Sequence, residues 1–239
     1  MFIGTRQRLK NKNDAIKHCH ISIEGNEIQK VDSCKYLGVI IDKNLSWNDH
    51  IERVRKKVIK SIYLLKRLRS FINERTALLF YRSIIQCNLD YCSSVWSNGS
   101  KSQLDKLQFL QNRALRIVMN VEYLFPTSTL YETLKLDRLQ VRWSKLVART
   151  MYRAVNKLCP SYLSDIFSFR ETPYCIRSNQ CKLRLIQPKT NYGKRSLAYR
   201  GAKLWNDLDY LVSTPISIET FTRYLNRNPA LFLNRTTNV

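Results

Sequence analysis

The sequence has little glycine, little proline and few acidic side chains. Six Gly and six Pro among 239 residues exclude a collagen, a glycine-rich phosphate-loop protein and a flexible linker. No apolar run approaches the roughly 18 residues that a membrane-spanning helix needs, and no apolar signal segment follows the N-terminus. The seven cysteines are an odd number, which favours reduced thiols in an intracellular protein, cytoplasmic or nuclear.

The shortage of acids leaves a large excess of positive charge. Eighteen Asp and Glu stand against 41 Lys and Arg, so the formal net charge is +23. Apolar residues make up 44% of the chain, which is enough for a folded core and excludes a disordered tail. An excess of this size predicts a polyanionic partner, and nucleic acid is favoured over an anionic membrane surface.

Hydrophobic periodicity divides the chain into a strand-rich beginning and a helical remainder. Alternation from His20 to Val31 around Gly25-Asn26 predicts a hairpin, and the apolar run Lys35–Asp42 predicts a strand buried on both faces. From residue 46 the period becomes helical, with Ser46 and Asp49 resembling a capping box. One apolar face is then formed by Ile51, Val54, Val58, Ile62, Leu65 and Leu68. Further predicted helices begin after Ser100 or Ser102 and near Asn73, the latter with these residues inward: Ala77, Leu78, Tyr81, Ile84 and Ile85. Others cover about residues 128–134, 137–158, 196–208 and 217–226.

These patterns predict an α+β protein that is predominantly α-helical. We expect a small β part at residues 1–45, a helical domain at 46–122 and an α-rich module at 123–239. Residues 182–186 alternate like a strand within that last module.

Basic side chains gather on the predicted helices. Five of them share an arc of about 100° opposite the apolar face of the helix at 51–70: Arg53, Lys56, Lys57, Lys60 and Arg67. A second row follows the long helix at spacings of four, three and four, and Arg153 extends it: Arg138, Arg142, Lys145 and Arg149. Like charges at such spacings repel, so the rows favour phosphate binding, with an ordinary solvated face as the alternative.

A third basic stretch combines cations with aromatic rings. Arg195 and Arg200 belong to it, with Tyr199 and Trp205 close by. Such a mixture suits a single strand, whose bases stack on rings while cations meet its backbone. The stronger alternative is that Tyr199 and Trp205 are core anchors.

The sequence shows no convincing catalytic or metal site. Two-metal chemistry needs clustered carboxylates, but the acids are scattered and no two Asp are adjacent. His18-Cys19-His20 with Cys34 downstream fits no common zinc spacing. We therefore expect no metal, no cofactor, no small-molecule substrate and no membrane partner.

Several strings, each weak alone, together resemble one family. The strings are Lys35–Asp42, Leu45-Ser-Trp47, His50-Ile51, Tyr81–Ile85, Leu89–Cys92, Val95-Trp96, Leu107–Ile117, Arg177–Gln180, Lys194–Ser196, Tyr199–Asn206 and Ser217–Phe221. In this combination they resemble the region after the catalytic box in reverse transcriptases of non-LTR retrotransposons (LINE-type, jockey/CR1-like).

The resemblance implies a fragment of a polymerase. Residues 1–45 correspond to the end of the palm, with Tyr36, Leu37 and Gly38 matching its primer grip. Residues 46–122 correspond to a thumb, and residues 123–239 to the C-terminal region. The family's Asp-Asp box falls upstream of residue 1, so Mg²⁺ is implied only for the full-length enzyme, and the fragment is expected to be inactive alone.

The partners implied by the resemblance are an RNA or RNA/DNA template–primer and the missing N-terminal part of the polymerase. Two other interpretations remain open at this point. One is a stand-alone basic interaction module that never belonged to a polymerase, and the other is a decayed, non-functional copy.

Overall fold

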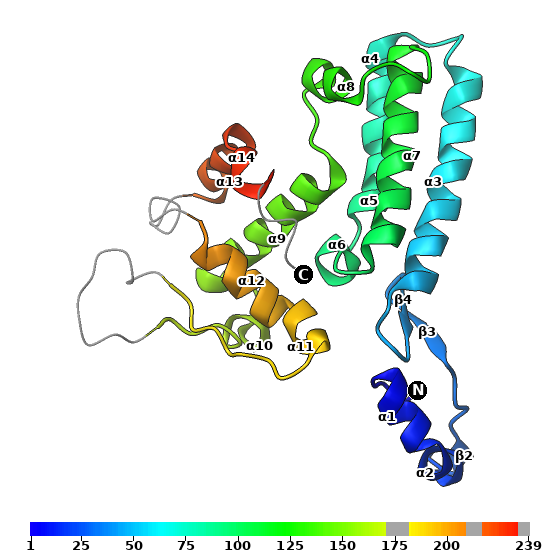
Figure 1. The fold of residues 1–239 in the computed structure, drawn as a ribbon, viewed down its shortest axis with the longest axis vertical. Helices are drawn as coiled ribbons and strands as arrows, with labels where there is room; N and C mark the ends of the chain where they lie inside the picture. The colour runs from blue at the N-terminus through cyan, green and yellow to red at the C-terminus, as the bar shows by residue number, and fades with distance from the viewer. Residues whose placement is uncertain (171–181, 209–216, 234–239) are drawn as a thin grey trace. The chain divides into compact units, whose positions relative to one another are not determined.

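The computed structural model describes residues 1–170, 182–208 and 217–233, so the string Arg177–Gln180 lies outside the described residues. The described chain is predominantly helical, with two antiparallel sheets of two strands each, which confirms the predicted fold class. It forms two compact units (Figure 1). The first contains residues 1–92 and 99–125, and the second contains residues 93–98 together with the chain from residue 126 onward.

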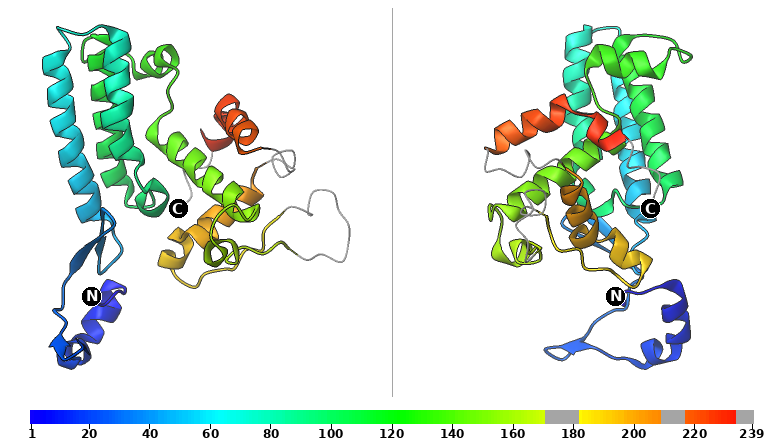
Figure 2. Two further views of the ribbon diagram at one scale, coloured as in Figure 1. Left: turned by 180° about the vertical axis from the view of Figure 1, so that it is seen from behind. Right: turned by 60° about the vertical axis from the view of Figure 1, so that its left-hand side comes forward.

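The first unit begins with short elements and continues into a helical bundle. Its elements are α1 (Arg6–Asn11), α2 (Asn13–His18), β1 (Ser22–Ile23), β2 (Asn26–Glu27), β3 (Ser33–Tyr36), β4 (Val39–Asp42), α3 (Asn48–Leu68), α4 (Glu74–Phe80), the π-helix η1 (Tyr81–Gln86), α5 (Cys87–Asp90) and α7 (Lys101–Met119). Helix α3 and helix α7 run in the same direction side by side, and α4, η1 and α5 run back along one side of this pair (Figures 1 and 2).

The first 45 residues differ from the prediction in three ways. Residues 6–18 form the helices α1 and α2 instead of strands. The first hairpin is present, but its turn is Glu24-Gly25, one residue earlier than expected. The run Lys35–Asp42 is two strands, because Leu37 and Gly38 both take positive φ and form a two-residue hairpin turn.

A short turn connects β4 to helix α3, and Asp42 organises that turn. The Asp42 carboxylate accepts hydrogen bonds from the backbone N–H groups of Asn44, Ser46 and Trp47 at 2.9–3.2 Å. The N-cap is Trp47, in the left-handed region, and it makes no side-chain cap. The predicted capping box of Ser46 and Asp49 is therefore wrong: the Ser46 N–H donates to Asp42 and not to Asp49, and among the described residues the Ser46 Oγ accepts only from the Asn48 N–H, at 3.4 Å.

The bundle core follows the predicted helical stripes with one local shift. The α3 stripe is buried at Ile51, Val54, Val58, Ile62 and Leu65, as predicted. In η1 the expected inward residue Ile84 is 38% exposed, while its neighbour Ile85 is fully buried. The π-helical turn explains this, because its wider winding rotates the following side chains relative to an α-helix.

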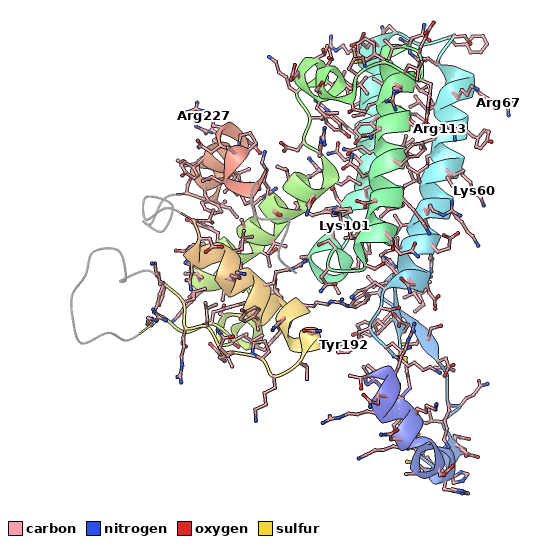
Figure 3. All side chains as sticks on the ribbon, in the orientation of Figure 1. Lys60, Arg67, Lys101, Arg113, Tyr192 and Arg227 are labelled. Atoms are coloured by element: carbon pink, nitrogen blue, oxygen red, sulfur yellow. The ribbon has the colours of Figure 1, made fainter. Side chains whose placement is uncertain are left out.

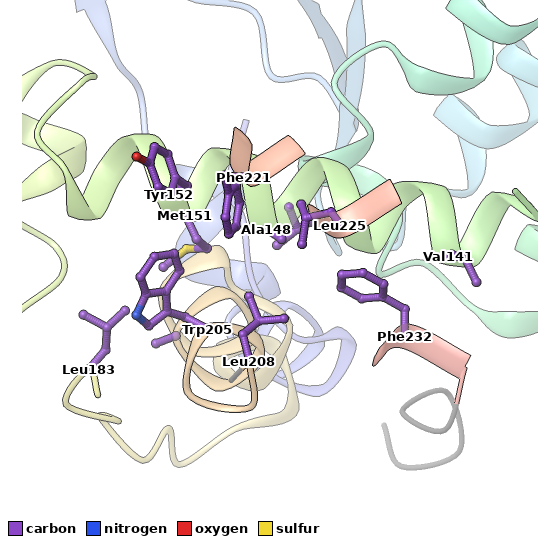
Figure 4. Close-up of a cluster of buried hydrophobic side chains, with 12 residues drawn as sticks. Val141, Ala148, Met151, Tyr152, Leu183, Trp205, Leu208, Phe221, Leu225 and Phe232 are labelled. Atoms are coloured by element: carbon purple, nitrogen blue, oxygen red, sulfur yellow. The ribbon is translucent and has the colours of Figure 1, made fainter. Parts of the chain in front are cut away.

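The second unit packs its helices around α9. Its elements are α6 (Ser93–Trp96), α8 (Thr127–Leu134), α9 (Leu139–Val155), α10 (Ser161–Ser164), α11 (Asn191–Arg195), α12 (Leu197–Asn206), α13 (Ile218–Arg227) and α14 (Ala230–Leu233). Figure 4 shows their core, where Phe221 stacks on Tyr152 at 4.6 Å between ring centroids, with Trp205 at 6.3 Å. Trp96 of α6 meets Trp143 of α9 edge to face at 5.2 Å.

The predicted strand at residues 182–186 is reduced to a single bridge between Phe169 and Leu183. A side chain replaces the missing strand partner. The Asn206 amide accepts from the Leu183 N–H at 2.6 Å and donates to the Leu183 carbonyl at 2.9 Å. Because Asn206 satisfies both backbone groups, Leu183 enters the core without a sheet.

Candidate nucleic-acid interface

Helix α3 presents a row of cations on the side opposite its buried stripe. Lys56, Lys57, Lys60 and Arg67 are exposed and Arg53 is half-buried, and these five residues are called the α3 face. Figure 3 shows Lys60 and Arg67 projecting from α3 away from the other bundle helices. Among the described residues, none of the five forms an ion pair within 4 Å; the acid Glu52 pairs instead with Arg55 at 2.7 Å.

The α3 face raises the local electrostatic potential enough to affect a buried histidine. The His50 ring is 2% exposed, and its Nδ1 accepts a hydrogen bond from the Ile40 N–H of β4 at 3.3 Å. Burial lowers the pKa of His50, and the charges of Arg53 and Lys57 lower it further. A neutral His50 therefore ties the hairpin to the first turn of α3, beneath the cations.

The hairpin tip is formed by Tyr36, Leu37 and Gly38, the residues that match the primer grip. Tyr36 is 65% exposed and Leu37 is 75% exposed. The tip is held from below by Tyr91, whose hydroxyl donates to the Leu37 carbonyl at 2.6 Å. Gly38 has φ +84°, and a Cβ there would lie 3.2 Å from the Tyr91 ring. Glycine therefore fits this position both because of its backbone conformation and because of the close ring. The tip is thus a fixed, outward-facing apolar turn.

Three residues that the sequence patterns do not single out lie beside the α3 face. Tyr63 of α3 is 59% exposed, and the Arg113 guanidinium of α7 lies over its ring at 5.9 Å from the centroid. Phe109, one helical turn before Arg113, is 50% exposed. A signal is present in the sequence, since Tyr63 lies between Lys60 and Arg67 at helical spacing, but pairing it with α7 requires the fold.

The predicted row on α9 is correct except at Lys145. Arg138, Arg149 and Arg153 are exposed and Arg142 is half-buried, and these four are called the α9 ridge. Lys145 is 6% exposed, and its Nζ donates to the Asp137 carboxylate at 2.6 Å. Its placement on the exposed row is wrong, because α9 is buried on most of its circumference and Lys145 falls at the edge of that buried arc.

The third basic stretch is also part of the packing. The Arg200 guanidinium donates to the Ser94 carbonyl at 2.7 Å and to the Ser97 hydroxyl at 3.3 Å, and burial lowers its pKa. The Arg195 carbonyl accepts from the Asn98 amide at 2.7 Å. Trp205 is 3% exposed, which confirms the core alternative for that ring. Arg200 does not extend a free basic surface, because its guanidinium is bonded to Ser94 and Ser97.

Clustered metal ligands and membrane-spanning helices are both absent from the described part of the chain. Within residues 1–170, 182–208 and 217–233, no three His, Cys, Asp or Glu side chains gather where they could share a metal ion. No helix in these ranges is both long and apolar enough to cross a bilayer.

Comparison with known proteins relates the chain to transposon polymerases. The chain is 30% identical over 120 residues to a probable RNA-directed DNA polymerase from transposon X-element of Drosophila melanogaster, covering 48% of this chain and 13% of that protein. It is 26% identical over 132 residues to the corresponding protein of transposon BS (54% and 15%) and over 137 residues to that of mobile element jockey (56% and 15%), both from the same fly. No family model and no solved structure matches the chain.

These homologues confirm the resemblance carried by the sequence strings. The curated relatives are RNA-directed DNA polymerases of Drosophila non-LTR retrotransposons, related to this chain at low identity over about half of its length. The aligned segment spans only 13% to 15% of each of the three relatives described.

Proposed function

We propose that this chain is the non-catalytic C-terminal portion of a retrotransposon-encoded RNA-directed DNA polymerase, and that it binds template–primer nucleic acid through the phosphate backbone. The observation that carries the proposal is the α3 face. Its five cations, from Arg53 to Arg67, lie on one side of one rigid helix, without ion pairs among the described residues. Such a row binds phosphates and reads little sequence.

The hairpin tip supports the same proposal from the other end of α3. Tyr36 and Leu37 are exposed at the hairpin tip. The Tyr91 hydroxyl donates to the Leu37 carbonyl and the Ile40 N–H donates to His50, which keeps the hairpin next to the helix start. In the proposed function this tip contacts the primer strand, as the match to the family's primer grip suggests, while the α3 face contacts phosphates of the duplex.

The α9 ridge supplies a second candidate surface in the other unit. We propose that Arg138, Arg142, Arg149 and Arg153 bind phosphates, and we leave Lys145 and Arg200 out of the binding set because their side chains are engaged within the unit. No metal and no cofactor is included in the function of this chain, since its acids are scattered along the sequence.

A direct test compares two charge-matched double variants for binding to a labelled RNA/DNA duplex. Lys56→Gln with Lys60→Gln removes two exposed cations from the α3 face, and Arg75→Gln with Arg82→Gln removes two exposed cations from α4 and η1. We expect the first variant to lose affinity by about ten-fold or more at low salt, because two phosphate contacts disappear. The second should bind nearly as the wild type does.

Equal weakening in the two variants would contradict the proposal, because net charge alone would then explain the binding. Nucleotide incorporation by the purified chain on a primed template would contradict its non-catalytic part. Circular dichroism of each variant shows whether the helices remain folded.

A further inference from the structure

Tyr63 of α3, together with Phe109 and Arg113 of the neighbouring helix α7, offers exposed rings and a cation whose combination phosphate binding alone does not use. We call these three residues the Tyr63 platform. Tyr63 is 59% exposed and Phe109 is 50% exposed. Exposed rings beside cations suit a ligand that has both apolar faces and negative charge.

The geometry of the platform is fixed before any ligand arrives. The Arg113 guanidinium lies 5.9 Å from the centre of the Tyr63 ring and covers one face of it, while more than half of the residue stays exposed. Helices α3 and α7 are packed along their length, and Arg69 at the end of α3 donates to the Ile117 carbonyl of α7 at 3.0 Å. The ring is therefore held on rigid elements, which lowers the entropic cost of stacking on it.

The surroundings of the platform are cationic. Lys60 and Arg67 lie about one turn before and after Tyr63 on α3. Lys106 lies one turn before Phe109 on α7, close enough to Glu52 of α3 to lower the pKa of that carboxyl, although Arg55 is the main cause. The acids of α3 and α7 are Asp49, Glu52 and Asp105. Glu52 pairs with Arg55 at 2.7 Å, and the other two are exposed.

From this arrangement we infer that the Tyr63 platform stacks unpaired bases of a single-stranded segment of nucleic acid, while the neighbouring α3 face holds its phosphates. Flat rings beside a cationic row are the two parts of a sequence-tolerant single-strand site. The base pairs of an intact duplex hide their faces inside the stack, so the platform would act on a strand that leaves the duplex. The inference rests on the proposed function and adds the unpaired strand as its substrate.

The test uses two labelled strands with identical phosphates: a 12-residue oligothymidylate and a 12-residue strand in which every base is replaced by an abasic site. Fluorescence anisotropy with the full chain should show binding to both, with the base-containing strand bound at least about five-fold more tightly. In the double variant Tyr63→Leu with Phe109→Leu, we expect this preference to vanish while affinity for the abasic strand stays unchanged. Leucine keeps apolar bulk but has no ring face.

The matched control is Tyr162→Leu, a residue that is 77% exposed in the second unit and far in sequence from the platform. It should keep the wild-type preference. Equal binding of the two strands by the wild type, or a preference that survives in the platform variant, would overturn the inference and leave phosphate binding intact. Absence of binding to both strands and to the duplex would instead refute the proposed function.

Discussion

Asp42 joins the hairpin to the basic helix. Burial alone would raise the pKa of its carboxyl, but the N–H donors of Ser46, Trp47 and Asn44 outweigh burial and the pKa lies below its ordinary value. The charged form is therefore the one that the fold stabilises. The position of the α3 face depends on this residue, because its hydrogen bonds fix the turn that leads into α3.

Replacing Asp42 by Ala should lower the free energy of unfolding by about 1–3 kcal/mol, since three backbone N–H groups lose their acceptor. Urea unfolding followed by circular dichroism measures the change. Asp32→Ala is the control, because the pair of Asp32 with Lys43 is exposed and should contribute less than about 1 kcal/mol. Similar destabilisation of both variants would show that Asp42 does not organise the turn.

The same carboxyl predicts a pH dependence. Because the folded pKa of Asp42 is lowered, its contribution is fully present above the unfolded value of about 4 and is lost as pH falls through the folded pKa. The wild type should therefore lose stability below about pH 4 more steeply than Asp42→Asn. If the stability of the two proteins fell equally with pH below about 4, the lowered pKa of Asp42 would be contradicted.

Lys145 and Arg149 lie one helical turn apart on α9, but Lys145 is buried and Arg149 is exposed. Lys145→Gln should destabilise the second unit by about 1–3 kcal/mol, because the ion pair between Lys145 and the partly buried Asp137 is lost, and should leave nucleic-acid binding unchanged. Arg149→Gln should do the reverse. Thermal melts and duplex affinity of the two variants distinguish these roles, and weaker binding by a fully folded Lys145→Gln would place that lysine back on the interface.

At the scale of elements, the β3–β4 hairpin depends on one crowded glycine. Gly25 and Gly38 have nearly equal φ, +80° and +84°, but only Gly38 faces a neighbour, the Tyr91 ring. Both alanine variants should lose about 1 kcal/mol from backbone strain. Gly38→Ala should lose more, because the Tyr91 ring must also move. Equal destabilisation, measured by urea unfolding, would show that Tyr91 does not hold the hairpin tip.

The helices are predictable from sequence because their apolar stripes are long and their caps are local. The helices expected near Asn73, Ser100, Ser196 and Ser217 have these residues as their N-caps, and Asn73, Ser196 and Ser217 accept the cap hydrogen bonds. The hairpin at Leu37-Gly38 is not predicted from the sequence, because leucine in the turn makes Lys35–Asp42 look like one continuous apolar strand. The π-helical turn is not predicted either, because no residue type marks such a turn.

The parts of the candidate site that lie on one helix can be predicted from the sequence. The α3 face follows from the period of α3 alone, and structure and sequence agree on its position. Lys145 and Arg200 were misplaced because their burial depends on partners from other segments, Asp137 and the residues of α6. The Tyr63 platform escapes prediction for the same reason, since it needs both α3 and α7.

Across the whole molecule, the cations behind the net charge of +23 serve different purposes. Some cations make hydrogen bonds within a unit, as Arg200 does with Ser94. Others lie in rows at the surface, as on the α3 face and the α9 ridge. Only the exposed rows can release counterions when a polyanion binds. The salt dependence of binding therefore reports how many cations of each row meet phosphates.

The most direct measurement is the slope of the logarithm of duplex affinity against the logarithm of salt concentration, for the wild type and for Lys56→Gln with Lys60→Gln and Arg67→Gln. If these three cations of the α3 face meet phosphates, each substitution makes the slope shallower by about 0.9, and the triple variant by nearly three. A triple variant that stays folded and keeps the wild-type slope would show that the α3 face does not touch the backbone of the nucleic acid.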